Sequence, residues 1–89
     1  MIHRDIIIYG RVQGVGFRFS ARSAARKYFI KGFVRNLPDG SVYIEAEGTE
    51  DNTNYFISWC RQGPPGAIVD NLEISDGEIK NFSGFDIRM

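Results

Sequence analysis

Two segments of this chain have the apolar spacing of a helix, and each lies between stretches with the composition of strands. In residues 17–28 the apolar side chains that follow the helical period are Phe17, Ala21, Ala24, Ala25 and Tyr28. Side chains at this spacing form one face of a helix, and that face has to be covered by an apolar partner surface. The rest of the chain must therefore supply such a surface.

The second helical segment begins after Thr49, a residue type that accepts a hydrogen bond from the first turn of a helix. Glu50 and Asp51 follow it, at positions where the helix dipole favours acidic side chains. The apolar stripe of this segment consists of Tyr55, Phe56, Trp59 and Cys60. The run Gly63-Pro64-Pro65-Gly66 is a helix-ending signal, so we expect the helix to end there.

The expected strands are residues 2–11, 30–36, 42–47, 67–75 and 85–88. In the third of them, Val42, Ile44 and Ala46 alternate with Tyr43, Glu45 and Glu47. A period of two is typical of a strand with one buried and one solvated face, so Glu45 and Glu47 are predicted to face solvent. Pro38-Asp39-Gly40 predicts a tight turn that joins the second and third strands in a hairpin.

The order of these elements is strand, helix, strand, strand, helix, strand, with a short strand at the end. This order is typical of the split βαβ pattern, a ferredoxin-like βαββαβ sandwich of the α+β class. We therefore predict an antiparallel sheet with two helices on one face and a short C-terminal strand. The length of 89 residues suits one domain, covering 1–89.

The net charge is zero, but it is divided unevenly between the two parts of the chain. Residues 1–36 contain eight basic residues and one acid, for a net charge of +7, and residues 37–89 carry a net charge of −7. Such a split can mark an anion-binding region. Without an overall basic excess, no nucleic-acid partner is expected, and most of the basic side chains are predicted to pair with acids of the second part.

The remaining composition limits the possible chemistry. Cys60 is the only cysteine, which excludes an internal disulfide and favours a reducing, cytoplasmic location. No apolar run approaches the roughly 18 residues of a membrane span, so no membrane partner is expected. His3, the only histidine, is predicted at the surface and Cys60 in the core, which leaves no nucleophile beside a base. No clustered His or Cys spacing indicates a metal site.

Residues 10–18, Gly-Arg-Val-Gln-Gly-Val-Gly-Phe-Arg, join the first strand to the first helix. Gly14 and Gly16 allow the backbone to turn tightly and to expose N–H groups at a helix start, which is a binding site for anions. Arg18 in the first helical turn can reach the same point, and its guanidinium suits two phosphate oxygens. The other interpretation is a plain glycine turn beside a surface arginine. Neither the Walker A pattern nor the dinucleotide fingerprint is met.

Asn36 ends the second expected strand, just before the Pro38-Asp39-Gly40 turn. Asparagine at such a place is commonly a turn former. Its amide can also hold a water molecule, because it offers both a donor and an acceptor. The residues alone leave both roles open.

Two motifs resemble the acylphosphatase family. Gly10, Val12, Gln13, Gly14, Val15, Phe17 and Arg18 are similar to its first signature, and Gly32-Phe33-Val34-Arg35-Asn36 with Gly40, Val42 and Gly48 is similar to its second. Gly63-Pro64 with Ala67 and Val69, and the ending Phe85-Asp86-Ile87-Arg88, resemble the closing half. The resemblance therefore covers nearly the whole chain.

The resemblance implies an enzyme that hydrolyses acyl phosphates to a carboxylate and inorganic phosphate, with no metal or organic cofactor. Arg18 resembles the family's phosphate-binding arginine, and Asn36 resembles the residue that positions the attacking water. The loop residues Gly14, Val15, Gly16 and Phe17 resemble its amide cradle for the phosphate. Arg18 and Asn36 are accordingly the expected catalytic residues.

Two other functions fit the same residues less well. Lys31-Gly32-Phe33 begins like an RNA-recognition signature, but Val34 and Leu37-Pro38 depart from it. Acylphosphatase-like domains also occur within larger enzymes that handle carbamoyl phosphate, although the start at Met1 favours a free-standing enzyme. The small size and the absence of a heptad pattern favour a monomer.

Overall fold

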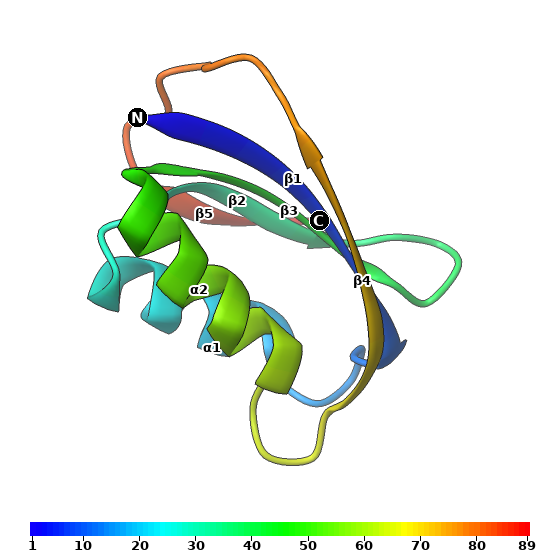
Figure 1. Cartoon of the computed structure of the whole chain (residues 1–89). Helices are drawn as coiled ribbons and strands as arrows, with labels where there is room; N and C mark the ends of the chain where they lie inside the picture. Colours follow the sequence, from blue (N-terminus) through cyan, green and yellow to red (C-terminus); the bar gives the residue numbers. More distant parts are fainter.

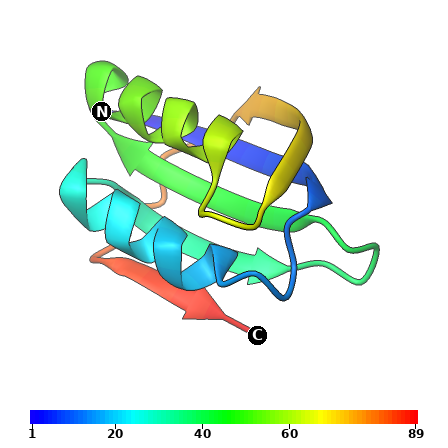
Figure 2. The ribbon, with the colours of Figure 1, turned by 90° about the horizontal axis from the view of Figure 1, so that it is seen from below.

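A five-stranded sheet carries both helices on one of its faces in the computed structural model, which describes residues 1–89 (Figure 1). The elements in chain order are β1 (Ile2–Arg11), α1 (Phe17–Lys27), β2 (Lys31–Asn36), β3 (Val42–Gly48), α2 (Glu50–Gln62), β4 (Ile68–Asp76) and β5 (Phe85–Arg88). The helices lie next to each other on the sheet, roughly along the strands, and run in opposite directions (Figure 2). The predicted ferredoxin-like βαββαβ order with a C-terminal strand is confirmed.

The strands are arranged in the order β4-β1-β3-β2-β5. The pairs β1–β3, β1–β4 and β2–β3 are antiparallel, whereas β5 runs parallel to β2. The sheet is therefore mixed, and the prediction of an antiparallel sheet is wrong for its last strand. The reason is that β4 and β5 occupy opposite edges, so the chain crosses the sheet between them and enters β5 in the direction of β2.

The core lies between the helices and the inward face of the sheet. The strands contribute Ile6, Ile8, Val34, Val42, Ile44 and Ala46, and the helices contribute Phe17, Ala21, Ala24, Ala25, Phe56, Ile57 and Cys60. Burial of one such large apolar side chain stabilises the fold by about 1.5–3 kcal/mol. The alternation in β3 and the helical spacing in α1 thus predicted the buried faces correctly, and the prediction that Cys60 belongs to the core is confirmed.

The helix ends follow from local chemistry. The Thr49 hydroxyl accepts a hydrogen bond from the backbone N–H of Asn52 at 3.1 Å, as its position predicted. At the end of α1, the N–H of Ile30 donates to the carbonyl of Ala25 at 2.7 Å across the left-handed residue Phe29, whose φ is +57°. This closure turns the chain from α1 directly into β2.

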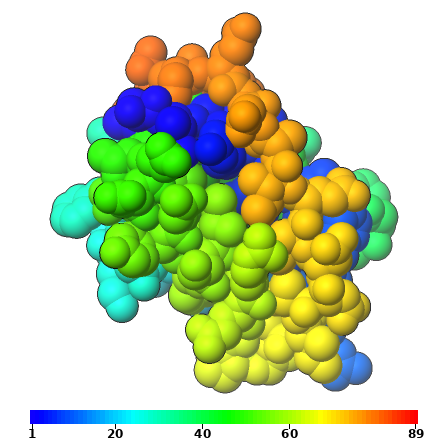
Figure 3. Space-filling model, viewed as in Figure 1, coloured from blue at the N-terminus to red at the C-terminus, as the bar shows by residue number.

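Residues 77–84, which we call the crossing segment, carry the chain from the edge strand β4 to the opposite edge strand β5 (Figure 1). They lie beside the N-terminal residues of β1 at one end of the molecule (Figure 3). Within this segment, the Phe82 ring stacks on His3 at 6.1 Å and meets Phe33 edge-on at 5.8 Å. The crossing segment therefore covers part of the sheet face that the helices leave free.

Few of the basic residues of the first part pair with acids of the second part. Arg4 does so, with its guanidinium 2.6 Å from Asp76. Three others lie over aromatic rings: Arg22 over Phe19, Lys27 over Tyr28 and Arg35 over Tyr43. The prediction of general pairing is wrong, because the buried acids are held by other groups, described below. Neither helix is long and apolar enough to cross a membrane.

Candidate active site

The loop between β1 and α1 turns through two glycines in the left-handed region. Gly14 has a φ of +74°, and Gly16, the N-cap of α1, has a φ of +76°. No side chain caps this helix, and none of the backbone N–H groups of residues 14–18 donates a hydrogen bond within the chain. The loop therefore presents a row of free amide donors at the positive end of a helix dipole, which is the arrangement that binds anions.

These amides border a small pocket. The glycine-loop pocket, as we call it, has a volume of about 170 Å³ and is lined by Val12, Gln13, Gly14, Gly16, Phe17, Arg18, Phe19 and Asn36. A Cβ atom added to Gly14 or to Gly16 would meet no atom within 4 Å. The glycines are thus required by the backbone turn and not by crowding, and the space beside the amides is open to a ligand.

Val15 differs from its neighbours in the loop. Its side chain is partly buried and packs against the hydrophobic core, so it does not line the pocket. Among the predicted substrate-binding residues, Val15 can offer only its backbone N–H to a ligand. Its side chain instead anchors the loop to the body of the molecule.

Arg18 and Asn36 reach the pocket from different layers of the sandwich. Arg18 lies in the first turn of α1, and its guanidinium makes no hydrogen bond or ion pair within the chain. Asn36 is the last residue of β2, where its position two residues after Val34 places it on the helix-bearing face of the sheet. Its side-chain amide makes no hydrogen bond within the chain. Both polar side chains thus retain their full capacity to bind a ligand.

Gln13 is a pocket residue whose role the sequence did not indicate. Its side-chain amide donates to the carbonyls of Leu37 and Ser41 at 2.8 and 2.9 Å. Those two carbonyls belong to the turn that follows Asn36, so Gln13 ties the glycine loop to the β2–β3 hairpin. The only sequence signal was its place within the first motif. Gln13 is therefore a positioning residue, since it fixes the distance between the amide row and Asn36.

The pocket contains groups that can bind a ligand but no group that can act as an acid or a base. Its donors are backbone amides, one guanidinium and one neutral side-chain amide, and no carboxylate, imidazole or thiol lines it. Donors of this kind suit a ligand with several anionic oxygens, because each N–H has a fixed direction. The pocket can hold a tetrahedral anion against the loop while Asn36 faces it from the sheet.

A second polar site lies on the opposite face of the sheet, where solvated residues were predicted. His3 is 2% exposed, Glu45 6% and Glu47 3%. Strand alternation places all three side chains on the face of the sheet that is opposite the helices. The crossing segment covers them there. The predictions that His3 lies at the surface and that Glu45 and Glu47 face solvent are wrong, because strand alternation shows which face a residue is on and not what covers that face.

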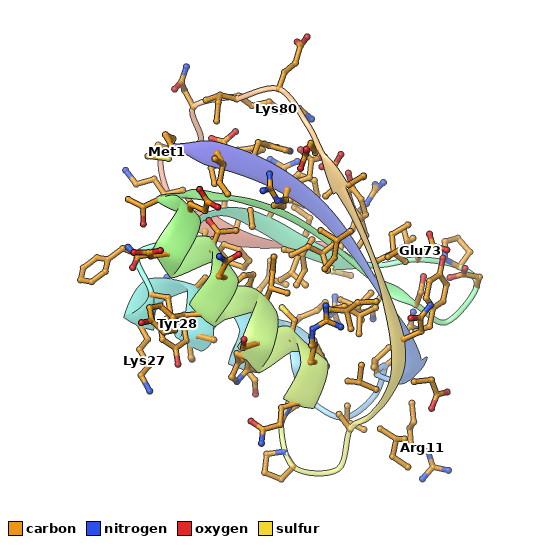
Figure 4. All side chains as sticks on the ribbon, viewed as in Figure 1. Met1, Arg11, Lys27, Tyr28, Glu73 and Lys80 are labelled. Carbon is orange, nitrogen blue, oxygen red and sulfur yellow. The ribbon has the colours of Figure 1, made fainter.

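We call His3, Asp5, Glu45, Glu47 and Lys80 the His3 cluster. His3 Nδ1 lies 2.7 Å from Glu47, and Nε2 lies 2.9 Å from Asp5 and 3.4 Å from Glu45. The Lys80 ammonium lies 2.7 Å from Glu45, and the backbone N–H groups of Lys80 and Phe82 donate to Glu47. Lys80 lies at the end of the molecule where Met1 precedes β1 (Figure 4).

The pKa values of the cluster follow from these contacts. Burial by itself lowers the pKa of His3, but the hydrogen bonds to Glu47 and Asp5 outweigh it, and the pKa is raised. For Glu47, burial raises the pKa, while the amides of the crossing segment and His3 lower it by more, so the net shift is downward. Because both ring nitrogens face carboxylates, the doubly protonated imidazolium satisfies this geometry best.

The structure brings together one set of potential metal ligands that the sequence did not reveal. Ligand atoms of His3, Asp5 and Glu45 lie within 4.8 Å of one another. Each of these atoms already has a partner of opposite charge in the chain, because His3 pairs with Asp5 and Glu45 and Lys80 pairs with Glu45. Cys60 is fully buried and its pKa is raised by burial, so it offers no thiolate.

Comparison with known proteins identifies the family and the fold of the chain. The acylphosphatase family model matches residues 4–87. An acylphosphatase of Archaeoglobus fulgidus is 47% identical over 87 residues, which cover 98% of each protein. The crystal structure of acylphosphatase from Bacillus subtilis is similar over the whole of both chains, with a TM-score of 0.97 at 34% identity. The chain also matches 12% of full-length HypF, with a TM-score of 0.88 at 35% identity.

Proposed function

Since the chain belongs to the acylphosphatase family and is a hydrolase that acts on acyl phosphates, we propose that it performs this reaction in the glycine-loop pocket. The observation that supports this location is the meeting of three features at one pocket. They are the free amides of residues 14–18, the unpaired guanidinium of Arg18 and the unpaired amide of Asn36. In this pocket a row of consecutive free amides at a helix N-terminus lies beside a cation.

The phosphoryl group of the substrate binds to the loop. The N–H groups of Gly14, Val15, Gly16 and Phe17 point to its oxygens, and Arg18 bridges two of them. The transition state of phosphoryl transfer spreads negative charge over the phosphoryl oxygens. Fixed donors in a pocket that needs no rearrangement therefore stabilise the transition state, and removal of one such donor typically costs a factor of about 10²–10³.

Asn36 orients the attacking water. Its side-chain oxygen accepts a hydrogen bond from the water and its NH₂ group can donate to a phosphoryl oxygen, which places the water in line with the bond that breaks. Asn36 is too weak a base to take a proton. The proton of the water passes to a phosphoryl oxygen, the new P–O bond forms, and the carboxylate leaves with the electrons of the old bond.

The leaving group explains why no general acid is needed. An acyl phosphate releases a carboxylate, whose conjugate acid has a pKa of about 4, so it departs without a proton. The absence of histidine, cysteine and carboxylates from the lining of the pocket is consistent with this reaction. The protein supplies position and electrostatic stabilisation in place of acid–base groups.

An RNA-binding function finds less support. It depended on an exposed aromatic platform at Lys31-Gly32-Phe33, but Phe33 is 5% exposed. Its ring is covered by Phe82 and by the guanidinium of Arg88, which lies 3.9 Å from the ring centre. A buried ring cannot stack on a base.

The test is hydrolysis of acetyl phosphate and benzoyl phosphate, with release of inorganic phosphate measured for the wild type and for Arg18→Ala. We expect rapid turnover by the wild type and almost none by the variant, with an unchanged circular dichroism spectrum. Equal turnover by both proteins would place the reaction elsewhere. Carbamoyl phosphate, assayed in parallel, tests the alternative substrate, because acylphosphatase-like domains of larger enzymes handle this compound.

We also propose that the protein is a cytoplasmic monomer. The single cysteine is buried, so it offers no exposed thiol for a disulfide between chains. Size-exclusion chromatography with light scattering, at several protein concentrations, tests the monomer. A mass of about twice 10.1 kDa would contradict it.

A further inference from the structure

A second depression adjoins the glycine-loop pocket and is not explained by phosphate binding. It is an open groove of about 440 Å³ on the helical layer, between α1 and the C-terminal end of α2. This volume is roughly fifteen times the share of one water molecule in the liquid. We call it the interhelix groove. It contains far more room than an acetyl group needs.

The walls of the groove are mixed in character. Trp59, Tyr28 and Phe19 supply aromatic surface, and Pro64 and Pro65 supply rigid apolar surface from the loop after α2. Lys27 and Tyr28 lie side by side at the end of α1 that is far from the glycine loop (Figure 4). Ser20, Ser23 and Lys27 add polar groups from α1, so the aromatic and proline surfaces are the part of the groove that favours flat, apolar ligands.

Phe19 connects the two depressions. It is the residue that lines both the glycine-loop pocket and the interhelix groove. Its side chain is 63% exposed, although a large aromatic side chain in contact with solvent gains little from folding. Phe19 follows Arg18 directly, so a ligand held by Arg18 and the loop amides has this ring as its neighbour.

The direction of the reaction also points to the groove. In-line displacement requires the attacking water and the leaving group on opposite sides of the phosphorus atom. Asn36, which orients the water, belongs to the sheet layer, whereas the interhelix groove lies in the helical layer. The acyl group therefore leaves the pocket on the side of Phe19.

We infer that Phe19 and the interhelix groove form the binding site for the acyl group of the substrate, and that the site favours aromatic or extended apolar acyl groups. This inference depends on the proposed function, because it takes the phosphate to be held in the glycine-loop pocket. The occupant is the acyl portion of the same substrate molecule. Phe19 is thus a specificity-determining residue, whereas Arg18 and the loop amides serve every acyl phosphate.

The experiment compares kcat/KM for benzoyl phosphate with kcat/KM for acetyl phosphate in the wild type and in Phe19→Ala. We expect the wild type to prefer benzoyl phosphate. In Phe19→Ala the ratio of the two values should fall about three- to tenfold, because the loss of an aromatic contact affects only the larger acyl group. Phe19→Leu, which keeps an apolar side chain without a ring, should give an intermediate ratio.

A second substitution probes the groove away from the pocket. Ser23 lies one helical turn beyond Phe19 and lines the groove but not the glycine-loop pocket. Ser23→Trp should fill the groove and lower kcat/KM for a longer substrate such as 3-phenylpropionyl phosphate by more than for acetyl phosphate. Phe29→Ala is the matched control, since Phe29 is also exposed but lies outside both depressions, and its substrate ratios should equal those of the wild type.

The outcomes separate this inference from the proposed function. If acetyl phosphate is hydrolysed and the ratios of Phe19→Ala and Ser23→Trp match the wild type, the acyl site is wrong while the proposed function stands. If Arg18→Ala hydrolyses both substrates normally, the location of the reaction is wrong as well. Inorganic phosphate should inhibit the wild type and Ser23→Trp equally, because phosphate does not enter the groove.

Discussion

The two polar regions of this molecule are built in opposite ways. In the glycine-loop pocket, the donors at residues 14–18 and the side chains of Arg18 and Asn36 have no partners within the chain. In the His3 cluster, every charged group has a partner of opposite charge or a backbone donor. Both regions contain charge, but only the first retains unused binding capacity.

The comparison shows that a polar group with a partner in the chain stabilises the fold, whereas one without a partner remains free to bind a ligand. The His3 cluster uses its charges to fasten the crossing segment to the sheet, so its interactions contribute to the free energy of folding. The glycine-loop pocket leaves its interactions for a ligand, so they contribute to binding and catalysis. The predictions below separate the two regions, because substitutions in one should change activity and substitutions in the other should change stability.

The largest effect is expected for Arg18→Ala. Loss of the only cation in the pocket should lower kcat/KM for benzoyl phosphate about 10³-fold. The free energy of unfolding should change by less than about 0.5 kcal/mol, because Arg18 has no partner in the folded chain. Steady-state kinetics and urea unfolding measure the two quantities. Arg26→Ala, two turns further along the same helix and outside both depressions, is the control and should retain most of the activity.

Glu47→Gln should lower stability and leave activity unchanged. Glu47 accepts from His3 and from two backbone N–H groups of the crossing segment, and an NH₂ group cannot accept there. We expect a loss of about 3 kcal/mol in the free energy of unfolding and a fall in Tm of more than about 10 °C. Below the transition, kcat should match the wild type. Glu78→Gln, an exposed acid of the same segment, should leave Tm unchanged. A strong loss of kcat in folded Glu47→Gln would break the separation of the two regions.

Asn36→Ala tests whether Asn36 orients the water while the loop and Arg18 bind the phosphate. If Asn36 orients water, kcat should fall about 10²-fold while the inhibition constant of inorganic phosphate changes only a fewfold. Product-inhibition kinetics measure both values. The reverse pattern, with weak phosphate binding and normal kcat, would assign Asn36 to phosphate binding.

The His3 cluster makes the stability of the fold depend on pH. The pKa of His3 is raised in the folded state, so its contribution is complete below the unfolded value of about 6.5 and is lost as pH rises through the folded value. The pKa values of Glu45 and Glu47 are lowered, so their contribution is complete above about 4.3 and is lost on acidification. Stability should therefore be greatest between about pH 4.5 and 6.5.

Urea unfolding at a series of pH values measures this window, and the ring proton signals of His3 in an NMR titration identify the group. Glu47→Gln should weaken the decline on the alkaline side. A stability that keeps rising above pH 6.5 in the wild type would contradict the assignment of His3 as a structural imidazolium.

Much of the fold was legible in local patterns. The spacing of Phe17, Ala21 and Ala25 predicted the buried face of α1, and the alternation in β3 predicted its inward residues. The Thr49 cap and the Pro38-Asp39-Gly40 turn were also correct. Such features depend on residues near one another in the chain, so periodicity and turn chemistry suffice to predict them.

The sequence by itself determined the order of the elements, the inward faces, and the nature of the glycine loop with Arg18 and Asn36 as candidates. Only the tertiary structure decided what covers the outer face of the sheet, because this depends on which strands lie at its edges. Since β4 and β5 lie at opposite edges, residues 77–84 must cross the sheet, and they bury His3, Glu45 and Glu47. Strand alternation in the sequence predicts which residues lie on the same face of the sheet. It does not predict what covers them, because the groups that contact Glu47 come from a segment more than thirty residues away in the chain.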